Sequence, residues 1–494
     1  MIAEIAYQWG LAAAQSASRG AQREWGQFMT PHPIAMLMAK RAVESLSGPT
    51  VRVLEPAAGT GVLMAAAAQA LLAKANRPSR IEILAYELDA SLLPHLRATS
   101  AALTEEARRC GVAVHCVLRN EDFLLSALAL HGHAVADLVI ANPPYFKLSA
   151  LDPRAVAHSY AVYGQPNIYG LFMAACSRLV RPGGGYCFLT PRSWTNGLYF
   201  KAVRRTLFER LSPARLHLFG SRTESFRDDN VLQETMIIWA RASAGTEALI
   251  TESAGIGELN ELRERVIELK RLIHEDDQSL RLSPTDQLPA SGWTESLGTL
   301  GLTVSTGPTV AFRAKDHLRS SPGSRTVPLL WMQHVHRSGV HWPGRREHEH
   351  IEANSATGWM LLHNSPMVLM RRFSPKEDLR RMTAVAYLGE LPCQFLGLEN
   401  HLNYVHRRGG ALERHEAIGL AAVLGCQRVD DFLRGRSGNT QVNASDLRQL
   451  PLPGWGSIQA IGRALDQAGS PLSVIDEVVE REASTQPMAE LRVA

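Results

Sequence analysis

Short apolar runs alternate with helix-like stretches between residues 49 and 245. The runs are rich in β-branched and aliphatic side chains and are bounded by turn residues, as strands are. An Ala-rich stretch of strong helix propensity, residues 62–75, follows the first run. The alternation predicts an α/β domain with a parallel sheet and crossover helices. The predicted strands are residues 51–56, 81–88, 112–118, 136–144, 185–191, 214–220 and 234–240.

A different apolar spacing follows this region. Leu259, Leu262, Val266, Leu269 and Ile273 recur at alternating steps of three and four, which predicts an amphipathic helix within residues 256–273. We expect this helix to bridge two domains, because its roughly two heptads are fewer than a dimeric coiled coil usually needs. A polar stretch with two prolines comes next and indicates a linker.

The predicted organisation therefore has three parts. A first α/β domain spans residues 1–245, a helical connector and linker span 246–290, and a second domain of mixed α+β pattern spans 291–494.

Composition excludes several classes of protein. The chain has 494 residues, of which 45% are hydrophobic and 20% charged, as is ordinary for a globular protein. No apolar run approaches the roughly 18 residues that a membrane span needs, so we expect a cytoplasmic protein without membrane contact. The six cysteines and the histidines of residues 334–350 lack ligand-like spacing, and we expect neither disulfides nor a metal site.

Charge is unevenly distributed. Residues 301–450 contain 17 Arg and 2 Lys against 13 acidic residues, although the whole chain has a net charge of only +4. The arginine fork suits phosphates and guanine edges, so this bias favours a nucleic-acid partner. A solvated, Arg-rich surface is the alternative.

The turn after the first predicted strand, residues 55–61, contains two glycines. Gly59 and Gly61 would allow a sharp turn into a helix and close approach of a ligand to the main chain. Met64 occupies the place of the third glycine of the dinucleotide fingerprint. A pyrophosphate cradle is therefore less favoured.

Acidic residues end the next two strands. A carboxylate at Glu87 or Asp89 can accept both hydroxyl hydrogens of a ribose. Asp122 and Phe123 could hold an adenine by its amino group and by its face. Each pair alone is also common at solvated strand ends. Such features at three successive strand ends predict an adenosine-containing ligand at the carboxyl edge of the sheet.

The fourth strand leads into Asn142-Pro143-Pro144-Tyr145. Prolines cannot donate to a sheet, so pairing stops here and leaves Asn142 and Tyr145 at its edge. The Asn142 side-chain oxygen and the Pro143 carbonyl can accept both N–H bonds of a nucleobase amine. That would free its delocalised lone pair for attack on an electrophilic methyl, while Tyr145 stacks on the base. A simple strand stop with an aromatic at the rim is the alternative.

In chain order, these segments resemble the AdoMet-dependent amino-methyltransferases of DNA. EPAAGTG, AYELDA, NEDF and NPPY carry the resemblance, and GQFMTP at residues 26–31 is similar to the N-terminal motif of the gamma, TaqI-like arrangement. The resemblance implies a Rossmann-like methyltransferase domain with a mixed, mostly parallel seven-stranded sheet. It also implies S-adenosyl-L-methionine as methyl donor and double-stranded DNA as partner, with the target adenine flipped out of the duplex.

The resemblance assigns roles to individual side chains. Asn142, Pro143, Pro144 and Tyr145 are the implied catalytic residues, and Phe226 is the second aromatic expected to stack on the base. The implied cofactor-binding residues are Phe28, Thr30, Pro31, Glu55, Ala57, Gly59, Gly61, Glu87, Asp122, Phe123 and Asn142.

The C-terminal half is similar to the recognition regions of PstI- and BsuBI-type modification methylases. VSTGPTVAFR, RRFSPKEDLRR, ENHLNYVHRRGG and GNTQVNASDLRQLPLP carry this looser likeness. It implies a separately encoded restriction endonuclease acting on the same DNA site. The residues expected to contact DNA are Arg371, Arg372, Arg380, Arg381, Arg407, Arg408, Asn439, Gln441 and Asn443.

We thus expect a site-specific DNA adenine-N6 methyltransferase of a type II restriction–modification system. One alternative is an enzyme of the same fold that methylates RNA or protein, although the GQFMTP segment and the large second domain argue against it. A catalytically silent DNA-binding subunit is another, against which the intact Glu87, Asp122, Asn142 and Tyr145 argue.

Overall fold

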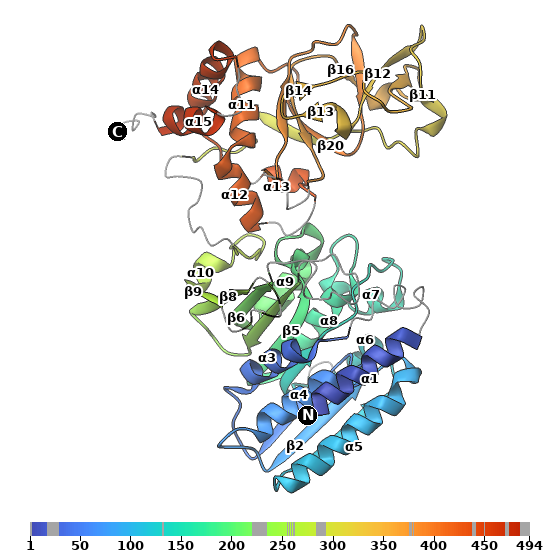
Figure 1. Ribbon diagram of the computed structural model, residues 1–494, viewed down its shortest axis with the longest axis vertical. Helices are drawn as coiled ribbons and strands as arrows, with labels where there is room; N and C mark the ends of the chain where they lie inside the picture. The colour runs from blue at the N-terminus through green and yellow to red at the C-terminus, as the bar shows by residue number, and fades with distance from the viewer. Residues whose placement is uncertain are drawn as a thin grey trace. The chain divides into compact units, whose positions relative to one another are not determined.

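The computed structural model describes residues 2–16, 29–130, 133–219, 235–253, 255, 257, 259, 262–282, 293–374, 378, 380–436, 441–448, 450–469 and 474–484. It divides into two compact units, Met1–Arg281 and Leu282–Ala494. Each unit has its own sheets and helices (Figure 1), and each is described by itself.

The first unit is built on a nine-stranded sheet of order β3-β2-β1-β4-β5-β7-β6-β8-β9. β1 pairs in parallel with β2 and β4, whereas β7 is antiparallel to both β5 and β6. All seven predicted strands are confirmed, and β8 and β9 extend the sheet beyond them. The strands are β1 (Thr50–Glu55), β2 (Arg80–Tyr86), β3 (Ala113–Arg119), β4 (Ala136–Ala141), β5 (Val180–Pro191), β6 (Ser212–Phe219), β7 (Thr235–Arg241), β8 (Glu247–Ser253) and β9 (Arg263–Glu268).

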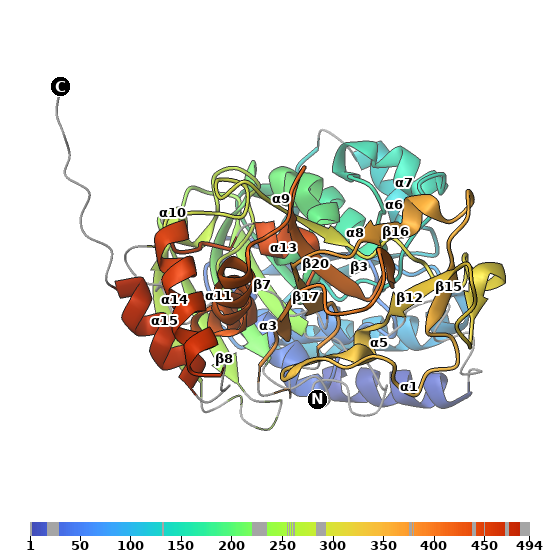
Figure 2. The ribbon, with the colours of Figure 1, turned by 90° about the horizontal axis from the view of Figure 1, so that it is seen from above.

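Helices cover both faces of this sheet (Figure 1 and Figure 2). One face carries α1 (Ile2–Ser16), α3 (His32–Val43), α4 (Val62–Leu72) and α5 (Leu93–Arg109). The other carries α6 (Phe123–Ser126), α7 (Pro153–Ala157), α8 (Ile168–Ser177) and α9 (Lys201–Phe208). The pleat of β4 shows why both layers are needed: Leu138 and Ile140 join the core under α3 and α4, and Val139 is buried on the opposite face.

The helix predicted within residues 256–273 is wrong. Residues 263–268 form β9, which pairs antiparallel with β8, and only Leu269–Leu272 is helical, as α10. Val266, expected on the apolar face of the helix, is 64% exposed on the strand. Backbone pairing with the open edge of β8 has overridden the local spacing of apolar residues.

The second unit is a mixed α+β domain, as predicted. Its sheets have the orders β10-β20-β17-β18 and β11-β15-β12-β19-β16, with a small hairpin of β13 and β14. The strands are β10 (Leu302–Thr306), β11 (Leu318–Arg319), β12 (Thr326–Leu330), β13 (Val335–His336), β14 (Gly339–Val340), β15 (His350–Glu352), β16 (Leu361–His363), β17 (Met367–Arg371), β18 (Ala384–Tyr387), β19 (Phe395–Leu398) and β20 (Leu402–Arg407). The helices are α11 (Arg414–Gly425), α12 (Gln427–Arg436), α13 (Ala444–Arg448), α14 (Trp455–Gln467) and α15 (Ile475–Ser484).

Strand β17 separates the two main cores of this unit. Val368 and Met370 face the helical core, whereas Met367 and Leu369 face the core shared with the five-stranded sheet. This alternation follows from the two-residue period of a strand.

Glycines bring α11 and α14 into backbone contact. A Cβ atom at Gly419 would lie 1.9 Å from the Ile458 carbonyl oxygen, and one at Gly462 would lie 1.9 Å from the His415 carbonyl oxygen. Neither position has room for a side chain, so this helix crossing requires glycine on both helices.

Candidate active site at the carboxyl edge of the first sheet

A cavity of about 900 Å³ opens at the carboxyl ends of β1 to β4. Ligands of open α/β sheets bind at this edge, outside the carboxyl ends of the strands. The cavity is lined by Met29, Thr30, Glu55, Pro56, Ala57, Ala58, Gly59, Val62, Leu63, Glu87, Leu88, Leu92, Glu121, Asp122, Phe123, Asn142, Pro144, Phe146, Arg154, Ile168 and Phe172.

The glycine turn after β1 forms the floor of this cavity. Gly59 and Gly61 have φ angles of +55° and +88°, which side-chain-bearing residues rarely adopt. A Cβ at Gly61 would also meet Met64 Cε at 2.8 Å and Leu96 Cδ1 at 2.9 Å. The second glycine is therefore fixed both by backbone conformation and by packing against α4 and α5.

Two buried carboxylates hold this turn. Glu55 Oε2 accepts the Met64 backbone N–H at 2.8 Å, and Glu87 accepts those of Gly59 at 2.6 Å and Asp89 at 2.7 Å. Burial raises the pKa of both carboxyl groups, and the backbone hydrogen bonds oppose that rise. Because a carboxylate can accept about four hydrogen bonds, Glu87 retains acceptor capacity toward the cavity.

Asp122 and Phe123 lie together at the end of β3. Asp122 Oδ1 caps α6 by accepting the Leu124 N–H at 2.9 Å, and its Oδ2 lies 3.8 Å from Nη1 of Arg154. Phe123 is buried and stacks against Phe172, with ring centroids 5.4 Å apart. A carboxylate, a guanidinium and aromatic rings thus surround this end of the cavity.

Asn142 connects the strand end to the N-terminal segment. Its Nδ2 donates to Thr30 Oγ1 at 3.0 Å, and its Oδ1 accepts from the Tyr145 hydroxyl. That hydroxyl also lies 3.1 Å from the Leu189 carbonyl oxygen. Burial raises the pKa of Tyr145 well above its ordinary value, so the hydroxyl stays protonated and available as a donor. The two contacts together fix which way the amide faces.

Most of the predicted site residues lie around this cavity. Thr30, Glu55, Ala57, Gly59, Glu87, Asp122, Phe123, Asn142 and Pro144 line it. Pro31 instead precedes the first turn of α3, and Tyr145 reaches the site through Asn142. Phe28 and Phe226 lie outside the described residues.

Several lining residues were not predicted from the sequence, among them Phe146, Arg154, Ile168 and Phe172. Phe146 directly follows the NPPY segment, and Ile168 and Phe172 are spaced i, i+4 on α8. Both signals could have been used. No feature of the sequence marks Arg154, which lies in α7 and forms a bidentate pair with Asp152, the N-cap residue of this helix.

One residue predicted to clamp DNA in the second unit does not fit that role. Arg381 is fully buried, and its backbone N–H donates to Asp430. A buried guanidinium cannot reach a phosphate, so the prediction for Arg381 is wrong. Its neighbour Arg380 is paired with Asp476.

The remaining predicted DNA contacts have varied surroundings. Arg407 pairs with Glu416 at 3.1 Å, and Arg371 donates through Nε to the Val335 carbonyl at 2.6 Å. Arg372 donates to the Asn400 carbonyl at 3.2 Å. Arg408 is exposed, Gln441 and Asn443 are half-buried, and Asn439 lies outside the described residues.

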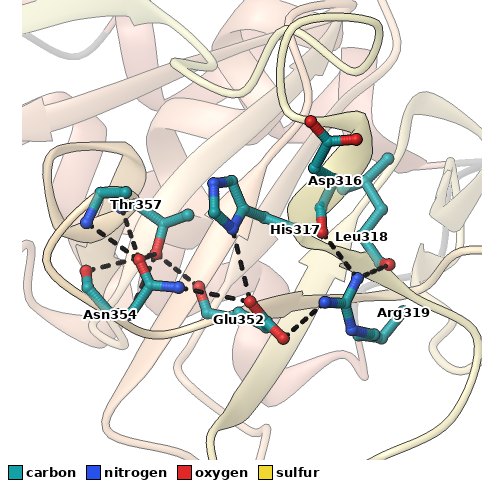
Figure 3. Close-up of polar contacts among 8 residues, drawn as sticks. Asp316, His317, Leu318, Arg319, Glu352, Asn354 and Thr357 are labelled. Carbon is teal, nitrogen blue, oxygen red and sulfur yellow. Dashed lines mark hydrogen bonds and ion pairs between the residues drawn. The ribbon is translucent and has the colours of Figure 1, made fainter.

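A polar network joins β11 to β15 in the second unit (Figure 3). Glu352 accepts from Nη2 of Arg319 at 2.6 Å and from Nδ2 of Asn354 at 3.3 Å, and lies 3.4 Å from Nδ1 of His317. The hydrogen bond from His317 and the charge of Arg319 lower the pKa of Glu352. This arginine is therefore engaged within the protein and holds the edge of the five-stranded sheet together.

The histidines of residues 334–350 make other contacts. His334 Nε2 lies 2.9 Å from Glu349 Oε1 in a buried pair, and the rings of His336 and His341 are 5.0 Å apart. Among the described residues, no group of three or more His, Cys, Asp or Glu side chains is placed to hold a metal ion. None of the helices that the structure describes is long and apolar enough to cross a membrane.

Comparison with known proteins gives a consistent result. Family models described as N-6 DNA Methylase and Eco57I restriction-modification methylase match residues 6–158 and 120–226. The type II methyltransferase M.BsuBI of Bacillus subtilis is 30% identical over 458 residues, which cover 89% of this chain and 90% of the relative. M.PstI of Providencia stuartii is 29% identical over 473 residues, covering 92% of each chain.

Similarity to solved structures concerns the fold. The type IIL restriction-modification enzyme MmeI, solved in complex with DNA, aligns with a TM-score of 0.55 at 10% identity. The alignment covers 93% of this chain and 73% of that one, so the likeness includes both units.

Proposed function

The chain belongs to the N6-adenine DNA methylases of type II restriction–modification systems, of the PstI and BsuBI type, and we propose that it methylates N6 of an adenine flipped out of double-stranded DNA. The methyl donor in this proposal is S-adenosyl-L-methionine. The protein would be the modification component of its system, with a separately encoded endonuclease acting on the same site.

The placement of Asn142 is the observation that carries this proposal. Its amide stands beside the cavity, at the end of a strand that two prolines terminate, and is oriented by Thr30 and Tyr145. An acceptor fixed in this way is positioned before the substrate arrives.

The donor set of the cavity fits S-adenosyl-L-methionine. Glu87 offers acceptors to a ribose, Asp122 and Phe123 offer an acceptor and a ring to an adenine, and the turn at Gly59 has no side chain to obstruct the ligand. Thr30 and Met29 would border its methionine end. When bound, this group supplies an electrophilic methyl.

The protein's own contribution is to prepare the attacking nitrogen. Asn142 Oδ1 and the Pro143 carbonyl would accept its two N–H bonds, which favours a pyramidal nitrogen with an available lone pair. The Tyr145 hydroxyl keeps the Asn142 amide oriented, and the Tyr145 ring would stack on the base. The new N–C bond would replace the S–C bond of the donor, with S-adenosyl-L-homocysteine as the other product. The surplus proton on N6 would pass to solvent after the transfer, so the transfer itself requires no general base.

DNA recognition would fall to the second unit. An adenine inside a duplex cannot reach the cavity, and extrusion of the base is a general solution among methyltransferases. Tyr145 and Phe226 would then replace part of the stacking that the base loses. Arg371, Arg372, Arg380, Arg407, Arg408, Asn439, Gln441 and Asn443 remain the proposed contacts to phosphates and base edges. The sequence suggests a catalytic domain at 1–245, a connector at 246–290 and a recognition domain at 291–494. Because β8 and β9 belong to the first sheet, we propose that the catalytic domain is the first unit, Met1–Arg281, and that the recognition domain is the second unit, Leu282–Ala494.

Transfer of tritiated methyl groups tests the proposal. The protein is incubated with labelled S-adenosyl-L-methionine and, separately, with unmethylated DNA, RNA and a protein extract. Label confined to adenine N6 in DNA supports the proposal. Label only in RNA or protein contradicts it, and the absence of label with all three substrates would indicate a silent DNA-binding subunit.

A further inference from the structure

An exposed apolar patch lies beside the catalytic segment. Leu198 and Tyr199, in the short helical turn η5 (Leu198–Phe200), are 53% and 54% exposed, and Tyr163 is also exposed. The Tyr199 ring lies over Gly164, where an added Cβ would come within 2.6 Å of it. Tyr199 therefore lies beside the segment that contains Tyr163 and Gly164.

This patch is connected to Tyr145 by a series of aromatic rings. Tyr145 meets Tyr169 edge-on at 5.9 Å between centroids, and Tyr169 stacks on Phe200 at 5.1 Å. Phe200 directly follows Tyr199. The loop that carries Tyr163 is bound to the segment after NPPY as well, because the Ile168 N–H donates to the Phe146 carbonyl at 3.0 Å. Buried rings thus connect the turn of Leu198 and Tyr199 to Tyr145, whose ring would stack on the target base in the proposed function.

A buried arginine makes the turn rigid. Arg204 on α9 is 1% exposed, and its Nη1 donates to the carbonyl oxygens of Trp194 at 2.9 Å and Gly197 at 2.8 Å. Its Nε donates to the Asp277 carbonyl at 3.0 Å. A Cβ at Gly197 would lie 2.6 Å from the Ser193 carbonyl oxygen, so the turn is also closely packed. A support of this kind pre-orders a binding element that would otherwise lose entropy on contact.

We infer that Leu198 and Tyr199 form a wedge that occupies the space in the duplex left by the flipped adenine. This inference rests on the proposed function. Extrusion of a base exposes the apolar faces of the adjacent base pairs and leaves the opposing base without a stacking partner. An aliphatic and an aromatic side chain bury such faces, as wedge residues do in other DNA-binding proteins. Neither side chain carries a charge, so contact with base faces suits them better than contact with phosphates.

The test compares two DNA duplexes that differ only opposite the target adenine. One duplex carries the normal partner base at that position, and the other carries an abasic site. In the abasic duplex, flipping the adenine breaks no base pair and leaves no partner base unstacked. Methylation is measured as kcat/KM with the full-length protein and S-adenosyl-L-methionine. The variants are Leu198→Ala and Tyr199→Ala. Leu128→Ala is the control, because Leu128 is a similarly exposed leucine of the same unit outside the cavity.

The wedge predicts a loss that depends on the partner base. On the normal duplex, each wedge variant should lose roughly 5- to 150-fold in kcat/KM, the range for one stacking contact. On the abasic duplex the loss should shrink to at most about threefold, since flipping costs less there. The affinity of each wedge variant for S-adenosyl-L-methionine should stay within about twofold of that of the wild type. The activity of Leu128→Ala should also stay within about twofold of the wild-type value.

Other results would overturn the inference. Equal losses on the two duplexes would show that the turn acts through folding or through contact with the second unit, and unchanged activity on the normal duplex would show no role. Leu198→Ala is the milder change, and its loss of activity must depend on the partner base in the same way. A folding defect confined to Tyr199→Ala therefore cannot be used to explain away a negative result. Failure of the wild type to methylate adenine would refute the proposed function itself.

Discussion

Nδ2 of Asn142 donates a hydrogen bond to Oγ1 of Thr30 across 112 residues of sequence, at 3.0 Å. Thr30 is almost fully buried and lies just before α3, whereas Asn142 directly follows β4. The contact determines which end of the amide faces Tyr145. Thr30 thus orients the amide that we propose to be catalytic, and it also lines the cavity.

Replacement of Thr30 by valine should therefore impair the chemical step. Thr30→Val keeps the shape of the side chain but removes the acceptor, so the Asn142 amide loses one of its two fixed contacts. We expect kcat to fall about 10- to 100-fold, with the KM for S-adenosyl-L-methionine changed much less. Steady-state kinetics of methyl transfer measure both parameters.

Thr30→Ser should retain most of the activity, because it keeps the hydroxyl. Thr206→Val is the matched control, since it removes a buried threonine hydroxyl that bonds only within α9. If Thr30→Val and Thr206→Val had the same kcat, Thr30 would have no role in orienting the amide.

The hydroxyl of Tyr145 can be separated from its ring. Tyr145→Phe keeps the ring for stacking but removes the donor to Asn142 Oδ1, so we expect kcat to fall about tenfold while the KM for DNA stays within about threefold. Tyr186→Phe removes a buried hydroxyl bond to the Met173 carbonyl outside the cavity and should leave kcat unchanged. A Tyr145→Phe enzyme with wild-type kcat would show that the hydroxyl is dispensable.

Sequence patterns were sufficient for the strand ends of the first unit. Buried strands followed by glycines, carboxylates or prolines are local features, so the sequence alone places Glu87, Asp122 and Asn142 at one edge of the sheet. The contact between Thr30 and Asn142 could not be derived from spacing, because it depends on how α3 packs on the sheet.

Long-range packing also explains why some predictions from the sequence were wrong or incomplete. The apolar spacing around Val266 suggested a helix, but the open edge of β8 recruits this segment as a strand. In the sequence, Arg381 belongs to an arginine-rich segment that suggests contacts to phosphates. Only the fold shows that Arg381 is buried beside Asp430 of α12. Arg154 lies on the short helix α7, and no periodicity of the sequence places this helix beside the cavity.

The crossing of α11 and α14 should be highly sensitive to a single methyl group. In Gly462→Ala, the new Cβ would overlap the His415 carbonyl oxygen at 1.9 Å, so the helices must separate. We expect the second unit to lose at least roughly 2 kcal/mol of unfolding free energy and DNA binding to weaken. Binding of S-adenosyl-L-methionine by the first unit should persist. Denaturant unfolding and separate binding titrations measure these effects.

Gly456→Ala is the control for this change, because it lies on the same helix with no atom within 4 Å of a new Cβ. Equal stabilities of the two variants would contradict the close crossing.

Acidification should destabilise the first unit through His217. Its Nδ1 lies 2.8 Å from Thr251 Oγ1 and its Nε2 lies 3.1 Å from Ser253 Oγ, and burial lowers the pKa of His217 from 6.5 to about 4. Between these values the unfolded chain binds a proton that the folded chain does not. The group therefore contributes roughly 3 kcal/mol that is present above about pH 6.5 and lost as the pH falls toward 4.

Denaturant unfolding of wild type and His217→Gln across this range measures the contribution. The variant should show the shallower dependence of stability on pH, because glutamine does not titrate. If the unfolding free energies of wild type and His217→Gln depended on pH with the same slope, groups other than His217 would cause the acid sensitivity.

The central claim is methyl transfer to adenine N6 in DNA, with Asn142 as the essential acceptor. The most direct measurement is modified-base sequencing of DNA from a host without other adenine methylation, expressing either the wild-type chain or Asn142→Ala. We predict N6-methyladenine at every copy of one short sequence with the wild type, and none with the variant, which should still bind S-adenosyl-L-methionine within a few-fold of wild type. Unmodified adenines in the wild-type host, or equal methylation by Asn142→Ala, would contradict the account.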